Sequence, residues 1–118
     1  MSTATQTRKS LLETCIQNCF DCLRECESCG QACLTGDDAK MFAQVIKLCQ
    51  DCADLCSLCL RFMSRKSEFH AQLCEVCAEA CDRCATECEK YDHDENCKRC
   101  AEACRRCADS CRQMAIAK

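Results

Sequence analysis

Cysteine thiols are the side chains of this sequence with the most evident chemistry, and their spacing repeats. Within residues 74–88 the cysteines are separated by steps of 3, 4, 3 and 4 residues, and residues 97–111 and 19–33 have the same spacing. Residues 49–59 begin a further copy, in which Met63 takes the place of the fifth cysteine. A helix turns once every ~3.6 residues, so these steps place the thiols on one face. Four copies of one spacing predict four helices, each with a stripe of sulfur.

The number of thiols indicates that sulfur itself is required. A single buried cysteine behaves as a small apolar residue. Here 20 cysteines occur among 118 residues, nearly all in one helical register. Leucine or valine would pack better in these positions and would not oxidise. Thiolates are soft ligands that select copper(I), zinc or iron–sulfur clusters, so the stripes predict a metal-binding core.

Charge favours copper(I) among these metals. If all the thiols ionised, a small core would hold a charge of about −20, which is too costly without compensation. Zinc ions in tetrahedral four-cysteine sites would leave about −10. One Cu⁺ per thiolate would leave a charge of about zero. The sequence therefore predicts multiple Cu(I) ions, roughly one per cysteine, with a zinc or mixed soft-metal store and a thiol/disulfide redox buffer as the alternatives.

The predicted metal ligands are all the cysteines and three neutral side chains in the same register. The cysteines are Cys15, Cys19, Cys22, Cys26, Cys29, Cys33, Cys49, Cys52, Cys56, Cys59, Cys74, Cys77, Cys81, Cys84, Cys88, Cys97, Cys100, Cys104, Cys107 and Cys111. His70 precedes the third repeat by four residues, Met63 replaces a thiol, and Met114 extends the last stripe. Lone histidines are commonly solvated and methionines commonly fill cores. As weak neutral ligands, however, these three would suit an entrance, while His93 and Met41 are candidates at the other end.

Local signals place the first two helices. Ser10 and Glu13 form a capping-box pattern that predicts the start of the first helix. Gly36 stands where a left-handed C-terminal cap is expected, and Asp37 or Asp38 is expected to cap the second helix. Residues 1–9 are polar and predict a loose arm or a short extra helix, which leaves residues 10–118 as a single domain.

The last two helices are placed by similar signals. Ser67 is the expected cap of the third helix, which should run to about Tyr91. Asp92 or Asp94 should cap the fourth helix, expected over residues 95–115. Because the connections are short, sequential helices should be antiparallel. The fold class predicted is therefore all-α, an up-down-up-down four-helix bundle with a cysteine-lined core.

Composition excludes several classes of protein. Disulfide-stapled secreted domains are rich in turns, whereas this chain has 2 glycines and no proline. Its first residues have no apolar run typical of a signal peptide, and no stretch is apolar enough to span a membrane. A net charge of −3 from interspersed acids and bases argues against a nucleic-acid partner. No serine–histidine–aspartate or phosphate-loop pattern is present, so we expect a protein of the cytosol that is not an enzyme.

The repeated Cys-x₂-Cys-x₃-Cys register, which extends over nearly all of residues 10–115, resembles that of the bacterial copper storage proteins. These are cysteine-lined four-helix bundles. The resemblance implies that thiolates hold many copper(I) ions inside the bundle and that the chain forms a homotetramer. Because its first residues lack the apolar run of a signal peptide, the sequence resembles the cytosolic branch of that family.

Overall fold

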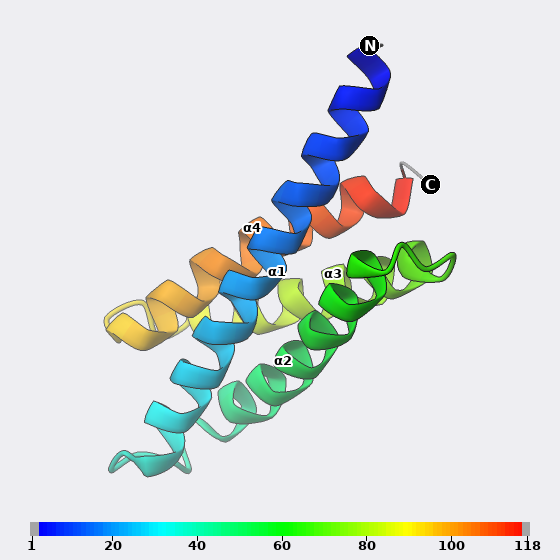
Figure 1. Cartoon of the computed structure of the whole chain (residues 1–118). Coiled ribbons are helices and arrows are strands. Elements are labelled where there is room, and N and C mark those ends of the chain that lie inside the picture. Colours follow the sequence, from blue (N-terminus) through cyan, green and yellow to red (C-terminus); the bar gives the residue numbers. More distant parts are fainter. Residues whose placement is uncertain (1–2, 117–118) are drawn as a thin grey trace.

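Four long helices make up the protein (Figure 1). A computed structural model describes the backbone of residues 3–116 and the side chains of residues 11–116. The helices are α1 (Thr3–Thr35), α2 (Ala43–Ser64), α3 (His70–Glu89) and α4 (Glu95–Ile116). The predicted all-α fold is confirmed.

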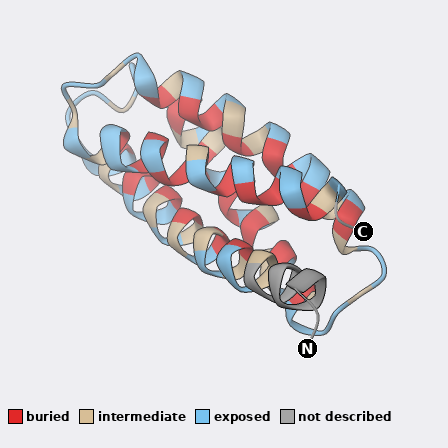
Figure 2. Ribbon diagram, turned by 90° about the horizontal axis from the view of Figure 1, so that it is seen from above, coloured by how far each residue is buried: buried red, intermediate tan, exposed pale blue. Residues whose placement is uncertain are grey.

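The helices form a closed antiparallel bundle. Each helix packs against its sequence neighbours, and α1 also packs against α4, which closes the ring. The α1–α2 and α3–α4 connections lie at one end, whereas the α2–α3 connection lies at the other end with the last turn of α4 (Figure 1). Figure 2 shows the buried residues as a stripe along the inward side of the helices. Among the described helices, none is long and apolar enough to cross a membrane.

Sulfur fills the core of this bundle. Every cysteine is buried, and the most exposed of them, Cys33, is only 5% exposed. Small residues flank the thiols where α3 and α4 meet, including the buried Ala78, Ala85, Ala101 and Ala108. Side chains of this size let two helices approach closely, so the core is narrow and its sulfur atoms lie near one another.

The start of α1 differs from the prediction. The helix begins at Thr3, so residues 3–9 continue α1 and do not form a separate arm or short helix. This segment contains neither glycine nor proline, and its alanine, glutamine, arginine and lysine favour helix. The side chain of Ser10 lies outside the described residues, as do residues 1–2 altogether, but the helical backbone already passes through that position.

The turn after α1 also differs from the prediction. Gly36 does not have a positive φ. A Cβ there would lie 3.2 Å from a carbonyl oxygen of the last turn of α1, so the absence of a side chain relieves crowding. Neither Asp37 nor Asp38 caps α2, whose N-cap position is Phe42. Instead, the backbone carbonyl of Asp38 accepts hydrogen bonds from the N–H groups of Met41 (2.9 Å) and Phe42 (3.2 Å), which extends the turn.

The predicted cap of α3 is wrong, because its N-cap position is Phe69 and not Ser67, whereas a predicted cap of α4 is correct. The Ser67 hydroxyl accepts a hydrogen bond from the Phe69 N–H (3.1 Å), but this orders the turn before the helix, which begins only at His70. At α4, the carboxylate of Asp94 accepts a hydrogen bond from the Cys97 N–H (3.0 Å). Asp94 is therefore the cap of α4, one of the two residues predicted for that role.

Polar contacts between helices fix their relative positions. Asn18 of α1 donates a hydrogen bond to the Ser110 hydroxyl of α4 (2.5 Å). Arg105 of α4 reaches Asp82 (3.2 Å) and Glu89 (2.7 Å) of α3. The Arg105 ion pairs are partly exposed and contribute little stability individually, but they favour one register of α4 against α3.

The first expectation is that the reduced, metal-free protein is already highly helical. Caps, turns and interhelical contacts provide a frame that needs no ion. Far-ultraviolet circular dichroism under anaerobic conditions measures this directly. A disordered spectrum that becomes helical only when metal is added would contradict it.

Candidate metal centre

The four thiol stripes meet along the axis of the bundle. Cys22 of α1 lies at the centre of this arrangement. Its Sγ is 3.7 Å from the Sγ of Cys52 on α2, 3.9 Å from that of Cys81 on α3 and 3.6 Å from that of Cys104 on α4. One thiol thus contacts thiols of the other three helices, which only the folded bundle can arrange.

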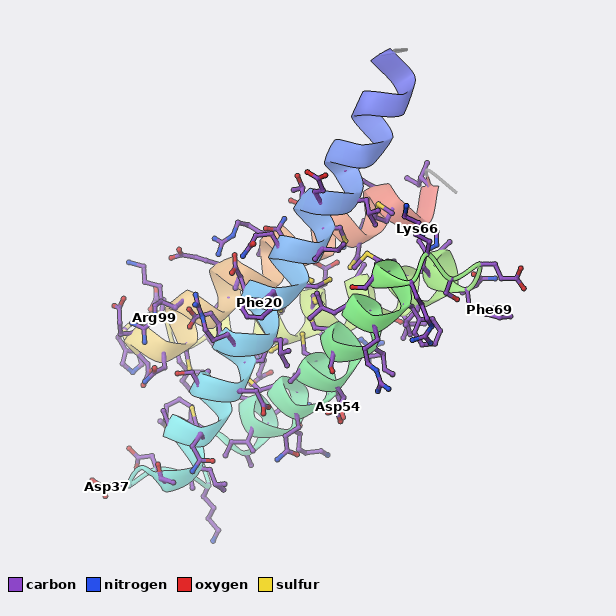
Figure 3. The ribbon with its side chains drawn as sticks, viewed as in Figure 1. Phe20, Asp37, Asp54, Lys66, Phe69 and Arg99 are labelled. Atoms are coloured by element: carbon purple, nitrogen blue, oxygen red, sulfur yellow. The ribbon has the colours of Figure 1, made fainter. Side chains whose placement is uncertain are left out.

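Contacts of this kind continue towards both ends. At the end that contains the α2–α3 connection, the Sγ atoms of Cys15 and Cys111 are 3.9 Å apart. At the other end, those of Cys29 and Cys97 are 4.0 Å apart. Cysteines four residues apart on one helix also meet, and the Cys22 and Cys26 Sγ atoms are separated by 3.8 Å. The sulfur atoms therefore form a continuous column, seen between the helices in Figure 3.

Groups of four thiols within this column are suited to metal ions. Within each group, all sulfur atoms lie within 4.8 Å of one another. Five such groups are Cys22/Cys26/Cys52/Cys104, Cys22/Cys52/Cys56/Cys81, Cys26/Cys84/Cys100/Cys104, Cys29/Cys49/Cys88/Cys100 and Cys56/Cys77/Cys81/Cys107. Several thiols belong to two groups, so a thiolate that bridges two ions would link neighbouring sites.

Burial disfavours the charged form of the metal-free thiols. Burial, together with repulsion from the nearby Cys29 and Asp94, raises the pKa of Cys33 to about 12. Burial also raises the pKa of Cys97, with added repulsion from Cys29, Cys33 and Asp94. A metal ion that binds a buried thiol must displace its proton. Replacing H⁺ by a monovalent ion leaves the charge of the core unchanged.

The three neutral candidate ligands lie at one end of the bundle. The antiparallel topology brings together the end of α2, the start of α3 and the end of α4. Met63 (1% exposed) and Met114 (8% exposed) belong to the buried core, while His70 is half-buried. The His70 Nδ1 lies 2.8 Å from the Ser67 carbonyl oxygen. Because a carbonyl only accepts, Nδ1 carries the proton in neutral His70, and Nε2 keeps its lone pair for a metal.

The opposite end is covered by an aromatic pair that the sequence did not reveal. The rings of Phe42 and Tyr91 pack with their centroids 4.8 Å apart, and the Tyr91 hydroxyl donates to the Met41 carbonyl (3.3 Å). Met41 is 50% exposed, and His93 is also exposed. Phe42 and Tyr91 lie in different connections, and no local pattern links them. Their contact follows from the juxtaposition of two turns.

A small acidic pocket also lies at this end. Its volume is about 220 Å³, and its lining includes Cys33 with Asp37, Asp38 and Asp94. The carboxylates make the surroundings of this thiol attractive to cations. Spacing along the chain could not reveal the pocket, because Asp94 joins it from a different connection.

Comparison with known proteins points to one family. The family model described as copper storage protein (Csp) matches residues 8–116. Apo copper storage protein 3 from Bacillus subtilis is 40% identical; the alignment covers 87% of this chain and 97% of that chain, with a TM-score of 0.80. The Cu(I)-bound protein BsCsp3 is 39% identical, with 89% and 98% covered and a TM-score of 0.84. No curated protein matches the sequence.

A more distant structure is similar in fold along most of its length. It is the cytosolic copper storage protein of Streptomyces lividans, described as loaded with five coppers. It is 28% identical, with 94% of this chain and 97% of that chain covered and a TM-score of 0.89. The four-helix arrangement is therefore retained where most residues differ.

The second expectation is that the metal-free protein loses stability in alkali. The pKa of Cys33 rises from its ordinary value of 9.0 to about 12 on folding. Between these values the unfolded chain holds fewer protons than the folded chain, so raising the pH favours unfolding. Anaerobic denaturant titrations at several pH values above about 9 should show a falling free energy of unfolding.

Cys33→Ser is the matched control for this experiment. Without that thiol, the fall in stability above the ordinary thiol pKa should be less steep. An unfolding free energy that stays constant or increases with pH in the unsubstituted protein would contradict the assignment of neutral, buried thiols.

Proposed function

The chain belongs to the copper storage protein family, and we propose that it stores many Cu(I) ions in the cytosol on the thiolates that line its core. Copper is then the cargo of the protein, and the role is not enzymatic. The metal-binding domain corresponds to residues 10–118. The agreement between the family match and the sulfur-lined core supports this function.

The observation that carries the proposal is the continuity of the thiol column. Isolated four-cysteine sites would each hold one ion, so the 20 cysteines would hold only about five ions. Shared thiols instead allow one ion to be linked to the next along the axis. Since each Cu⁺ can replace one thiol proton without changing the charge of the core, we propose a capacity of roughly one ion per cysteine, on all 20 cysteines.

We assign the three neutral candidates to an entrance. Met63, His70 and Met114 would act as weak first ligands that pass copper to Cys15, at the same end of the bundle, and so into the column. Thioether and imidazole groups need not lose a charge to release copper, which favours rapid exchange. The burial of both methionines next to the thiols and the free lone pair at the His70 Nε2 support this role.

The assembly is a homotetramer in this proposal. The tetrameric state rests on the resemblance of the sequence to the family. The location in the cytosol is supported by the Streptomyces lividans relative, which is a cytosolic protein. The proposal includes no nucleic-acid or membrane partner.

The third expectation concerns metal choice. Anaerobic titration of the reduced protein with Cu(I), with thiols and bound metal counted, should saturate at roughly one ion per thiol. Copper saturation near five ions, or Zn²⁺ binding tighter than Cu(I), would instead support the zinc or mixed-metal alternative. Negligible copper binding with rapid formation of specific disulfides in air would support the redox buffer.

The fourth expectation concerns the entrance. The triple variant Met63→Leu, His70→Phe, Met114→Leu should retain nearly the full copper capacity, because these ligands balance no charge. It should load copper, and yield it to a chelator, more slowly than the unsubstituted protein. Stopped-flow measurement of both rates tests this.

Its matched control removes thiolates from the interior. The variant Cys81→Ser, Cys84→Ser should lose about two ions of capacity, because serine is a poor ligand for a soft cation. If the triple variant exchanges copper at the unsubstituted rate, the entrance assignment is wrong. The end with Met41 and His93 then becomes the candidate entrance.

A further inference from the structure

Four thiols near the middle of the column lie close together. They are Cys22 and Cys26 of α1, Cys52 of α2 and Cys104 of α4, here called the central quartet. The Sγ distances from Cys22 to the other three are 3.8, 3.7 and 3.6 Å in that order. Cys104 lies 3.7 Å from Cys26 and 4.0 Å from Cys52. All four are at most 1% exposed.

These distances match the edges of a metal tetrahedron. A zinc–sulfur bond of ~2.3 Å places the sulfur atoms of a tetrahedral four-thiolate site ~3.8 Å apart. Five of the six sulfur–sulfur distances in the central quartet, 3.6–4.0 Å, are close to this spacing without any ion, and the sixth, Cys26 to Cys52, lies within 4.8 Å. Binding would therefore require only a small movement of three helices. We propose that the central quartet binds one divalent ion of the zinc class, Zn²⁺ or Cd²⁺, when the protein is poor in copper.

Neighbouring thiols can stabilise the charge of such a site. Four thiolates and one divalent ion carry a net charge of −2, so hydrogen-bond donors around the sulfur atoms are needed. The Cys81 Sγ lies 3.4 Å from that of Cys52, and the Cys100 Sγ lies 3.7 Å from that of Cys26. At these distances the S–H group of either neighbour could donate a hydrogen bond to a ligand thiolate.

The same neighbours limit the number of tightly bound divalent ions. Among the five groups given above, two share no member with the central quartet, and one of these contains Cys81 while the other contains Cys100. A second divalent ion in either group would add a further charge of about −2 nearby. Repulsion between two such sites favours a single tight divalent ion. Excess Cu(I) should expel it, because the monovalent ions use every thiolate and leave the core neutral.

The test is a titration of the reduced, copper-free protein with Co²⁺, a spectroscopic substitute for Zn²⁺. We expect one tight equivalent per chain, with the intense visible bands of tetrahedral tetrathiolate cobalt, and its displacement by one equivalent of Zn²⁺. Cys104→Ser and Cys26→Ser should each weaken this equivalent by more than about 100-fold, since loss of a group that only supports a ligand already costs ~10–100-fold. Ala53→Ser, which introduces the same side chain at a buried position of α2 without removing a thiol, should bind as tightly as the unsubstituted chain.

Either of two results would overturn the proposed site. One is the absence of a tetrathiolate cobalt spectrum in the unsubstituted protein, and the other is a tightly bound equivalent of Co²⁺ that survives both quartet substitutions. Circular dichroism of each variant checks whether the fold is retained. Because the two quartet variants change different helices, a folding defect in one variant leaves the other informative. Copper capacity is measured without divalent ions, so failure here and failure of copper storage are distinguishable.

Discussion

The need to hold many ionisable sulfur atoms in a dry core without net charge constrains the whole molecule. Each thiol is neutral while it keeps its proton, and burial favours this form. A thiolate in the same place must be matched by a cation. Monovalent copper satisfies this condition at one ion per sulfur, whereas a divalent ion in a four-thiolate site leaves a charge of about −2. The choice of metal ion therefore depends on the electrostatics of the protein core as much as on the soft character of the sulfur ligands.

The helical frame meets this constraint by separating support from binding. Thiols occupy the innermost stripe, and the larger apolar side chains that stabilise the bundle lie beside it, including Ile16, Leu23, Leu48 and Leu55. Polar contacts such as Asn18–Ser110 lie between neighbouring helices and outside the sulfur column. Since backbone hydrogen bonds and caps use no sulfur, protons and metal ions can exchange in the core while the helices remain in place.

The two ends of the column differ in chemistry. One end has the neutral soft side chains of Met63 and Met114. At the other, Phe42 and Tyr91 cover the bundle beside an acidic pocket over Cys33. At the end with the acidic pocket, carboxylates would attract a cation electrostatically. At the end with Met63 and Met114, soft neutral atoms would bind it as ligands. This asymmetry arises because the connections at the two ends have unrelated sequences while the stripes between them repeat.

The sequence by itself determined the helices, the face of each that carries sulfur, and the class of metal, because a step of three or four residues along one helix is local geometry. The sequence correctly included Asp94 among the possible caps of α4. Its predictions were wrong at the start of α1, where helix propensity extends the helix, and at Gly36, where the glycine relieves crowding and does not form a left-handed cap. Only the tertiary structure decided which thiols meet across helices. The contact between Cys22 and Cys104, or between Phe42 and Tyr91, depends on how far each helix slides and rotates against its neighbours. That alignment is set by packing and interhelical hydrogen bonds among residues far apart in the chain, and a repeated spacing fits many alignments equally well.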